Sequence, residues 1–173
     1  MPFVLPDDCT FQLLTSQDQE LVKEILYQSI FVPKGGARPS RGILESADLR
    51  KYYEGWGRQG DYGLSVTPAL GKKPVGGAFV RYHAASQAGY GFVSEQIPEL
   101  SIALYPGFRG MGLGTQLLER LINDLQTQDC PGISLSVDKR NPAMKLYEKF
   151  GFRTVRLEGN PTMLLSLKNA PLR

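Results

Sequence analysis

The stretch that decides the fold is Pro106-Gly107-Phe108-Arg109-Gly110-Met111-Gly112-Leu113-Gly114-Thr115. It follows an alternating apolar segment, residues 100–105, which predicts a strand buried on both faces. It precedes an apolar stripe at helical spacing, made by Leu117, Leu118, Leu121, Ile122 and Leu125. The first amides of a helix lack internal partners, and glycines let an anion come close to the backbone. A strand, this turn and a helix together therefore predict a phosphate-binding site.

Two widespread phosphate-binding turns do not fit this stretch. A Walker loop needs a lysine at the helix start, whereas this chain reads Gly112-Leu113-Gly114-Thr115. The dinucleotide fingerprint G-x-G-x-x-G would require its third glycine at Thr115 or at Leu117. The turn instead has the pattern R-x-x-G-x-G, which runs from Arg109 to Gly114.

This pattern and a second segment resemble the GCN5-related N-acetyltransferase (GNAT) superfamily. The second segment is Asn141-Pro142-Ala143-Met144-Lys145-Leu146-Tyr147-Glu148-Lys149-Phe150-Gly151-Phe152, and the resemblance covers residues 99–152 closely. It implies that backbone amides of the turn bind the pyrophosphate of acetyl-coenzyme A, the acyl donor. The cofactor contacts that the resemblance implies involve Ile102, Leu104, Arg109, Gly110, Met111, Gly112, Leu113, Gly114, Thr115 and Asn141.

The order of the expected elements, with the resemblance, predicts an α/β fold of the GNAT kind. Its central sheet would be mixed and mostly antiparallel, with helices flanking it. Since 173 residues suit one domain, we expect a single N-acetyltransferase domain over residues 1–173. Apolar periodicity predicts strands at 11–14, 62–66, 75–83, 100–105, 133–137, 152–157 and 163–167. It predicts helices at 21–30, 46–56, 113–125 and 141–150.

Composition excludes several other classes of protein. The chain is 42% hydrophobic and 21% charged, which excludes a disordered protein, and no apolar run reaches the ~18 residues of a membrane helix. Residues 1–8 do not read as a signal peptide. Two cysteines, Cys9 and Cys130, favour a reducing cytoplasm, and one histidine, His83, excludes most zinc sites, so we expect no metal. A net charge of +3 does not require nucleic acid as a partner.

The reaction that the resemblance implies needs a neutral amine. A lysine-like amine with a pKa of ~10.4 is neutral only about once in a thousand molecules near pH 7.4, and a carboxylate can take its proton. Glu99 is the candidate base, because its position resembles the glutamate that many GNAT enzymes use. Alternation places it on one face with Ser101 and Ala103. The alternative is that Glu99 is an ordinary polar residue at the end of a strand. Glu95 and Asp61 are further candidates for the base.

The resemblance also implies a proton donor and an oxyanion site. Tyr147 stands where the family uses a tyrosine to protonate the leaving thiolate; a core aromatic is the alternative. A backbone amide near Leu104 would meet the oxyanion, because family members splay this strand. Asn141 is expected to cap a helix whether or not it also contacts the cofactor. A covalent route through Cys9 or Cys130 lacks an identifiable activating environment.

The sequence does not determine the amine acceptor. Residues 32–42, 52–56 and 89–98 correspond to the family's variable acceptor regions, and antibiotics, polyamines, amino acids and protein N-termini stay open. Arg81 is a candidate for binding an acceptor carboxylate, with an exposed strand arginine as the alternative. A second function, a non-catalytic acyl-coenzyme A sensor, also stays open, although Glu99 together with Tyr147 favours an enzyme. GNAT proteins are often dimeric, so a homodimer is a further open state.

Overall fold

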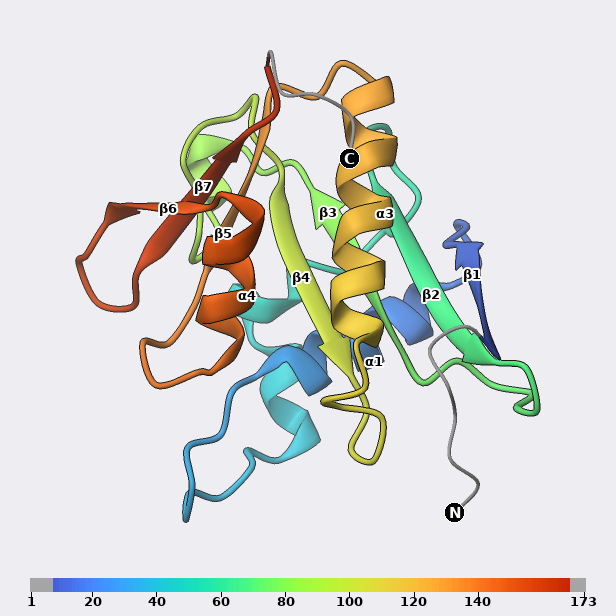
Figure 1. Ribbon diagram of the computed structural model, residues 1–173. Coiled ribbons are helices and arrows are strands. Elements are labelled where there is room, and N and C mark those ends of the chain that lie inside the picture. Colours follow the sequence, from blue (N-terminus) through green and yellow to red (C-terminus); the bar gives the residue numbers. More distant parts are fainter. Residues whose placement is uncertain (1–7, 169–173) are drawn as a thin grey trace.

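The computed structural model describes residues 8–168, and within that range seven strands form one sheet (Figure 1). In spatial order these are β1 (Cys9–Leu13), β2 (Tyr62–Pro68), β3 (Gly76–Arg81), β4 (Glu99–Leu104), β5 (Gly132–Ser136), β7 (Thr162–Ser166) and β6 (Arg153–Arg156). Neighbouring strands are antiparallel, except that β4 and β5 are parallel. The prediction of a mixed, mostly antiparallel sheet is therefore confirmed.

Helices cover both faces of the sheet. On one face lie α3 (Leu113–Thr127) and α4 (Ala143–Phe150), and α3 crosses in front of β3 and β4 in Figure 1. On the other face lie α1 (Gln19–Ser29) and two short helices, η2 (Arg41–Glu45) and α2 (Ala47–Arg50). One further turn, η3 (Ala85–Gln87), belongs to the long connection between β3 and β4. We call these two sides the α3 face and the α1 face.

The α3 face is covered by a regular amphipathic helix. The apolar residues that α3 buries recur every three or four positions: Leu113, Leu117, Leu118, Leu121, Ile122 and Leu125. They pack on Ala78, Val80 and Leu100 from the sheet. Each fully buried leucine contributes about 1.5–3 kcal/mol through removal of apolar surface from water, so this stripe anchors α3.

The α1 face is covered by less regular chain. Val22, Ile25 and Leu26 of α1 pack with Phe79 and Ala103 of the sheet. The aromatic residues Tyr52, Tyr53 and Trp56 complete this second apolar cluster. The core of the α1 face therefore depends on a segment that follows α2 and is not itself helical.

The predicted helix at 46–56 is wrong in length. Only α2, residues 47–50, is helical, and turns follow it through Gly57. Gly55 and Gly57 have φ values of 64° and 99°, which no α-helix accommodates. The carbonyls of Lys51, Glu54 and Gly55 accept hydrogen bonds from the Arg81 guanidinium, so side-chain donors replace the amides that a helix would supply.

The sheet opens between β4 and β5. Among the described residues these strands share a single register pair, Glu99 with Ser134, next to a 3.0 Å hydrogen bond from the Ser134 amide to the Pro98 carbonyl. Against β3, by contrast, β4 stays paired as far as Leu104 opposite Gly76. The two parallel strands therefore diverge toward the end at which the glycine turn begins.

In residues 8–168 no helix has the length and apolar character that crossing a bilayer requires.

Candidate active site

The predicted phosphate-binding turn lies at the end of β4 and leads into α3. Gly110 and Gly112 adopt left-handed φ values of 74° and 81°, which favour glycine. A Cβ on Gly110 would have no atom within 4 Å, so the space in front of the turn is open. The Gln116 amide is the first to bond back, to the Gly112 carbonyl at 3.2 Å. The amides of residues 113–115 precede it at the helix N-terminus, where the helix dipole favours an anion.

Arg109 fixes this turn to its surroundings. Its Nε donates to the Leu104 carbonyl at 2.8 Å, and its Nη2 donates to the Gln28 carbonyl at 3.4 Å. The side chain therefore links the turn to the end of β4 and to α1.

Main-chain groups at the end of β4 point into the opening of the sheet. The Pro98 carbonyl bonds toward β5, whereas the Tyr105 amide bonds to Val75 beside β3 at 2.8 Å. Because successive residues of a strand direct their main-chain groups to opposite sides, the groups of Ile102 and Leu104 point toward β5. Since the β4–β5 pairing has ended there, the Leu104 amide faces the gap.

Glu99 is buried on the α1 face, with 4% of its surface exposed. Its Oε1 accepts two hydrogen bonds, from the Tyr52 hydroxyl at 2.6 Å and from the Gly91 amide at 2.8 Å. Within the described chain its Oε2 is buried and has no hydrogen-bond partner. A Cβ on Gly89 would overlap Oε2, so the segment around Gly89 lies directly over the carboxylate.

Burial raises the pKa of the Glu99 carboxyl above its ordinary value. The hydrogen bonds from Tyr52 and Gly91, and the charges of Lys51 and Arg156, oppose this rise by stabilising the carboxylate. Desolvation is the largest effect, so Glu99 holds its proton more tightly than a surface glutamate does. A buried carboxyl whose pKa is raised by desolvation is a candidate functional group.

Tyr147 lies on the other side of the sheet. Its ring packs in the cluster of the α3 face, with its centroid 5.7 Å from that of Phe152. Burial raises the pKa of its phenol to about 12. The structure therefore does not bring Glu99 and Tyr147 together on one face of the sheet.

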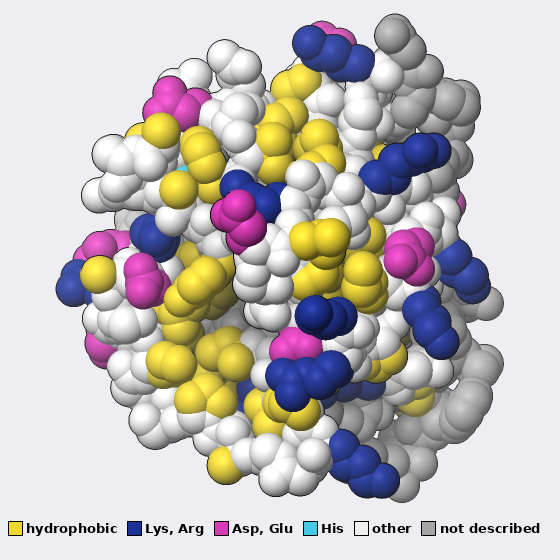
Figure 2. Space-filling model, turned by 90° about the vertical axis from the view of Figure 1, so that its left-hand side faces the viewer, with side chains coloured by type: hydrophobic (Ala, Val, Ile, Leu, Met, Phe, Trp, Pro, Cys, Tyr) yellow, Lys and Arg dark blue, Asp and Glu magenta, His cyan; other side chains and the backbone are white. Residues whose placement is uncertain are grey.

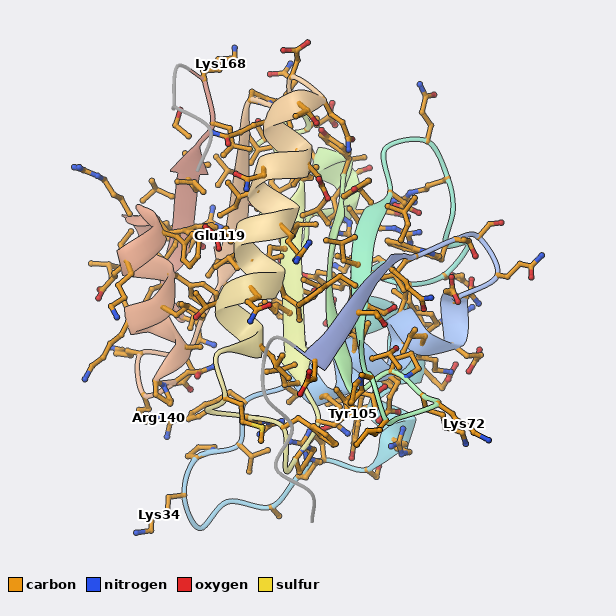
Figure 3. All side chains as sticks on the ribbon, turned by 45° about the vertical axis from the view of Figure 1, so that its right-hand side comes forward. Lys34, Lys72, Tyr105, Glu119, Arg140 and Lys168 are labelled. Carbon is orange, nitrogen blue, oxygen red and sulfur yellow. The ribbon has the colours of Figure 1, made fainter. Side chains whose placement is uncertain are left out.

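Asn141 caps α4, as predicted. Its Oδ1 accepts a 3.0 Å hydrogen bond from the Ala143 amide. Neighbouring Arg140 pairs with Asp138 at 2.7 Å. In Figure 3, Arg140 and Lys34 point away from the body of the molecule at its lower end, where β4 stops and Tyr105 follows. Cationic side chains therefore flank the end of the molecule that carries the glycine turn.

Both sequence interpretations of Arg81 are wrong, because its guanidinium is buried and fully engaged. It has 0% exposed surface and pairs with Asp61, with Nη2 and Oδ2 2.6 Å apart. It also lies over the Trp56 ring, 5.5 Å from the centroid. Arg81 and Asp61 thus form a structural ion pair, and Asp61 is committed to it. Glu95 accepts from the Ala85 amide at 2.8 Å on the surface.

Sequence reasoning missed the partners of Glu99. Tyr52 was placed only in a variable region, and Gly89 and Gly91 carried no recognised motif. The need for glycine at position 91 comes from tertiary packing, since a Cβ there would overlap the backbone of Leu135 and Ser136, and no sequence pattern marks it. In residues 8–168, no group of three or more His, Cys, Asp or Glu side chains is arranged to hold a metal ion.

Comparison with known proteins identifies the family. Residues 37–152, well over half of the chain, match the model of the acetyltransferase (GNAT) family. The chain belongs to the GNAT family of acetyltransferases. The resemblance of the turn and of the 141–152 segment is thereby confirmed.

Two curated relatives of this GNAT chain share one description. It is 35% identical over 68 residues to the [ribosomal protein bS18]-alanine N-acetyltransferase of Haemophilus influenzae, covering 39% of this chain and 47% of that protein. It is 38% identical over 73 residues to the enzyme of the same name from Salmonella typhimurium, covering 40% and 49%. The match therefore spans about half the length of these relatives.

A solved structure supports the GNAT fold. The protein yncA from Salmonella typhimurium, solved with its cofactor acetyl-CoA, superposes with a TM-score of 0.63 at 19% sequence identity. The superposition covers 94% of this chain and 96% of that one. At this identity the likeness establishes the fold.

Proposed function

We propose that this GNAT protein transfers an acetyl group from acetyl-CoA to a primary amine by direct attack. The observation that carries the proposal is the opening of the sheet between β4 and β5 beside the glycine turn, which Arg109 ties to the end of β4. An anion-binding turn next to an exposed strand amide at Leu104 suits a thioester with a long phosphorylated tail.

The turn of residues 109–115 fits the pyrophosphate of acetyl-CoA. Gly110 and Gly112 let the backbone approach it, and the free amides at the start of α3 would donate to its oxygens. The Leu104 amide, facing the gap, would donate to the acetyl oxygen as negative charge develops there. When bound, acetyl-CoA supplies the acetyl group and a thiolate leaving group.

Two side chains would handle the protons of this reaction. Glu99 would accept one proton of the acceptor ammonium on Oε2, the oxygen with no partner in the described residues, and the neutral amine would then attack. Tyr147, whose phenol has a pKa of about 12, stays protonated near neutral pH and would donate to the thiolate. Their positions on opposite faces of the sheet would separate proton acceptance from proton donation, with the reacting carbon in the gap between them.

We further propose that the acceptor is the α-amine of a protein N-terminus. The names of the two curated relatives support this acceptor, since both act on the alanine of a ribosomal protein. Exposed apolar surface also supports it: Tyr90 is 60% exposed and stacks on Tyr52, which donates to Glu99, and hydrophobic side chains gather on the side of the molecule shown in Figure 2. Arg156 of β6 donates a 3.0 Å hydrogen bond to the Phe92 carbonyl, in the segment that contains Gly89 and lies over Glu99. A peptide has side chains that would pack against such apolar surface, whereas a polyamine does not.

The test is transfer to a peptide that begins with alanine and also contains lysine. We expect release of coenzyme A in step with one acetyl group on the peptide, located at the N-terminus by mass spectrometry. The matched control is the same peptide with its N-terminus already blocked, which should remain unmodified. Acetylation of lysine in both peptides would overturn the α-amine assignment. Binding of acetyl-CoA without transfer to a panel of free amines would instead favour the sensor.

A further inference from the structure

The two oxygens of the Glu99 carboxylate have different surroundings. Oε1 accepts from the Tyr52 hydroxyl at 2.6 Å and from the Gly91 amide at 2.8 Å. Oε2, in the part of the chain that the structure describes, accepts from no group although it is buried. An oxygen that already accepts two short hydrogen bonds is a weaker proton acceptor than one that accepts none. The carboxylate is therefore polarised so that a proton would add to Oε2.

Tyr52 also ties the carboxylate to the chain above it. Its hydroxyl donates to Glu99 and accepts from the Tyr90 amide at 2.7 Å. Its ring lies edge-on to His83, with the centroids 4.9 Å apart, and stacks on Tyr90 at 6.5 Å. Burial raises the pKa of the Tyr52 phenol, so its proton stays on the hydroxyl and the direction of donation is fixed. Tyr52 thus holds the Glu99 carboxylate and the segment around Tyr90 in a fixed relative position.

The other charged or titratable groups around Glu99 come from four segments. Arg81 of β3 is its register partner, and His83 follows that strand. Lys51 follows α2, and Arg156 belongs to β6; both charges act to lower the pKa of Glu99. The Arg81 charge is shared with Asp61 by their ion pair, and burial lowers the pKa of His83 to about 4, so His83 is neutral near pH 7. Tyr52 is the titratable side chain that donates directly to the carboxylate.

We propose that Tyr52 is a positioning residue for proton acceptance by Glu99, because it holds Oε1 by hydrogen bonding and leaves Oε2 as the oxygen that takes the amine proton. The inference rests on the proposed function. In the step itself, one N–H bond of the acceptor ammonium breaks and an O–H bond forms at Oε2, which leaves the neutral amine. The new C–N bond replaces the C–S bond, the thiolate takes the proton of Tyr147, and the second proton that the nitrogen loses on forming the amide returns to the Tyr147 phenolate. Tyr52 keeps its own proton throughout.

The chain offers a matched control in the neighbouring tyrosine. Tyr53 is equally buried, belongs to the same apolar cluster, and donates its own buried hydrogen bond to the Leu44 carbonyl at 2.9 Å. Tyr53→Phe therefore removes the same atom and a comparable bond without touching Glu99. An effect of Tyr52→Phe that comes only from lost packing or stability should appear in Tyr53→Phe as well.

The experiment is a carbon-13 NMR titration of the Glu99 carboxyl in the protein without acetyl-CoA, with the signal assigned by its loss in Glu99→Gln. The Tyr52 hydrogen bond stabilises the carboxylate, so Tyr52→Phe should raise the Glu99 pKa, by about one pH unit, or about tenfold in proton affinity. Tyr53→Phe should leave it unchanged. If Tyr52→Phe does not fold, 3-fluorotyrosine in place of Tyr52 keeps the shape, donates more strongly and should lower the pKa. An unchanged Glu99 pKa in the Tyr52 variant, or equal changes at both tyrosines, would overturn the proposal.

A pH–rate profile of acetyl transfer extends the test. A base must lose its proton before it can act, so the acidic limb of kcat/KM should move to higher pH in Tyr52→Phe by the same amount as the NMR titration, and stay in place in Tyr53→Phe. A limb that stays in place in both variants would contradict the positioning role. If the wild-type protein transfers no acetyl group to any amine, the proposed function fails, whereas the NMR titration still decides whether Tyr52 sets the pKa of Glu99.

Discussion

The two faces of β4 are built in different ways. Toward α3, Leu100, Ile102 and Leu104 meet an apolar helix stripe. Toward α1, the same strand presents Glu99, and the neighbouring strand presents Arg81 in the matching register position. Both charged groups are buried beneath chain that is neither helix nor strand.

The difference shows that buried charged side chains need irregular backbone, whose amides and carbonyls are available as hydrogen-bond partners. Away from its two ends, a regular helix uses its amides and carbonyls internally, so its middle has none to offer to a buried ion. The turns after α2 offer three carbonyls to Arg81, and the segment before β4 offers the Gly91 amide to Glu99. The α3 face therefore contributes stability through apolar burial, whereas the α1 face contributes groups with defined direction and charge.

The largest expected effect comes from breaking the ion pair on the α1 face. Arg81→Met should cost about 3–5 kcal/mol in the free energy of unfolding, because it leaves the buried Asp61 carboxylate without its close counterion and with only Arg58 at 4.0 Å. Denaturant unfolding measures this cost. The double variant with Asp61→Asn should recover part of it, since the uncompensated charge is gone. A single variant within about 1 kcal/mol of wild type would mean that the pair does not hold this face together.

A smaller effect is expected on the α3 face. Tyr147→Phe removes one hydroxyl and should lower turnover by about 10- to 1000-fold, the range of a single proton donor. Acetyl-CoA affinity and unfolding free energy should change little, because the ring still packs on Phe152. Turnover and calorimetric binding are the measurements. Unchanged turnover, with chemistry shown to be rate-limiting, would make Tyr147 a core aromatic only.

The smallest effect is expected beside Glu99. Ser134 has its hydroxyl oxygen buried, and the described residues supply it with no hydrogen-bond partner. Removing an unsatisfied buried group relieves a desolvation cost, so Ser134→Ala should be neutral or stabilising by up to about 1 kcal/mol. Ser136→Ala, at a partly exposed serine of the same strand, is the matched control and should be neutral. Destabilisation by Ser134→Ala would show that its hydroxyl has a partner in solution.

The α3 face was largely predictable from the sequence. Its helix repeats apolar residues every three or four positions, and the turn before it combines glycines with Arg109, so the signals are local. The cap by Asn141 and the face on which Glu99 lies also followed from local spacing. These features depend on neighbours a few residues apart.

The α1 face was not predictable in the same way. Tyr52 and Glu99 are 47 residues apart in the chain, and Arg81 meets carbonyls up to 30 residues before it. Such contacts arise from tertiary packing and leave no periodic pattern. Because of these contacts, the helix predicted at 46–56 is shorter in the structure, and Arg81 is buried instead of being available to an acceptor. Long-range bonds between side chains and backbone therefore mark the limit of what this sequence predicts.

Calorimetric titration of acetyl-CoA into wild type, Gly112→Asn and Gly112→Asp tests most directly whether the turn binds the pyrophosphate. Asn and Asp have the same size and tolerate the left-handed φ of Gly112 similarly, so the two variants differ in charge. Repulsion between a carboxylate and a pyrophosphate at contact distance should weaken binding in Gly112→Asp by about 100-fold or more relative to Gly112→Asn, with both variants folded. Equal dissociation constants for the two variants would contradict the placement of acetyl-CoA at this turn.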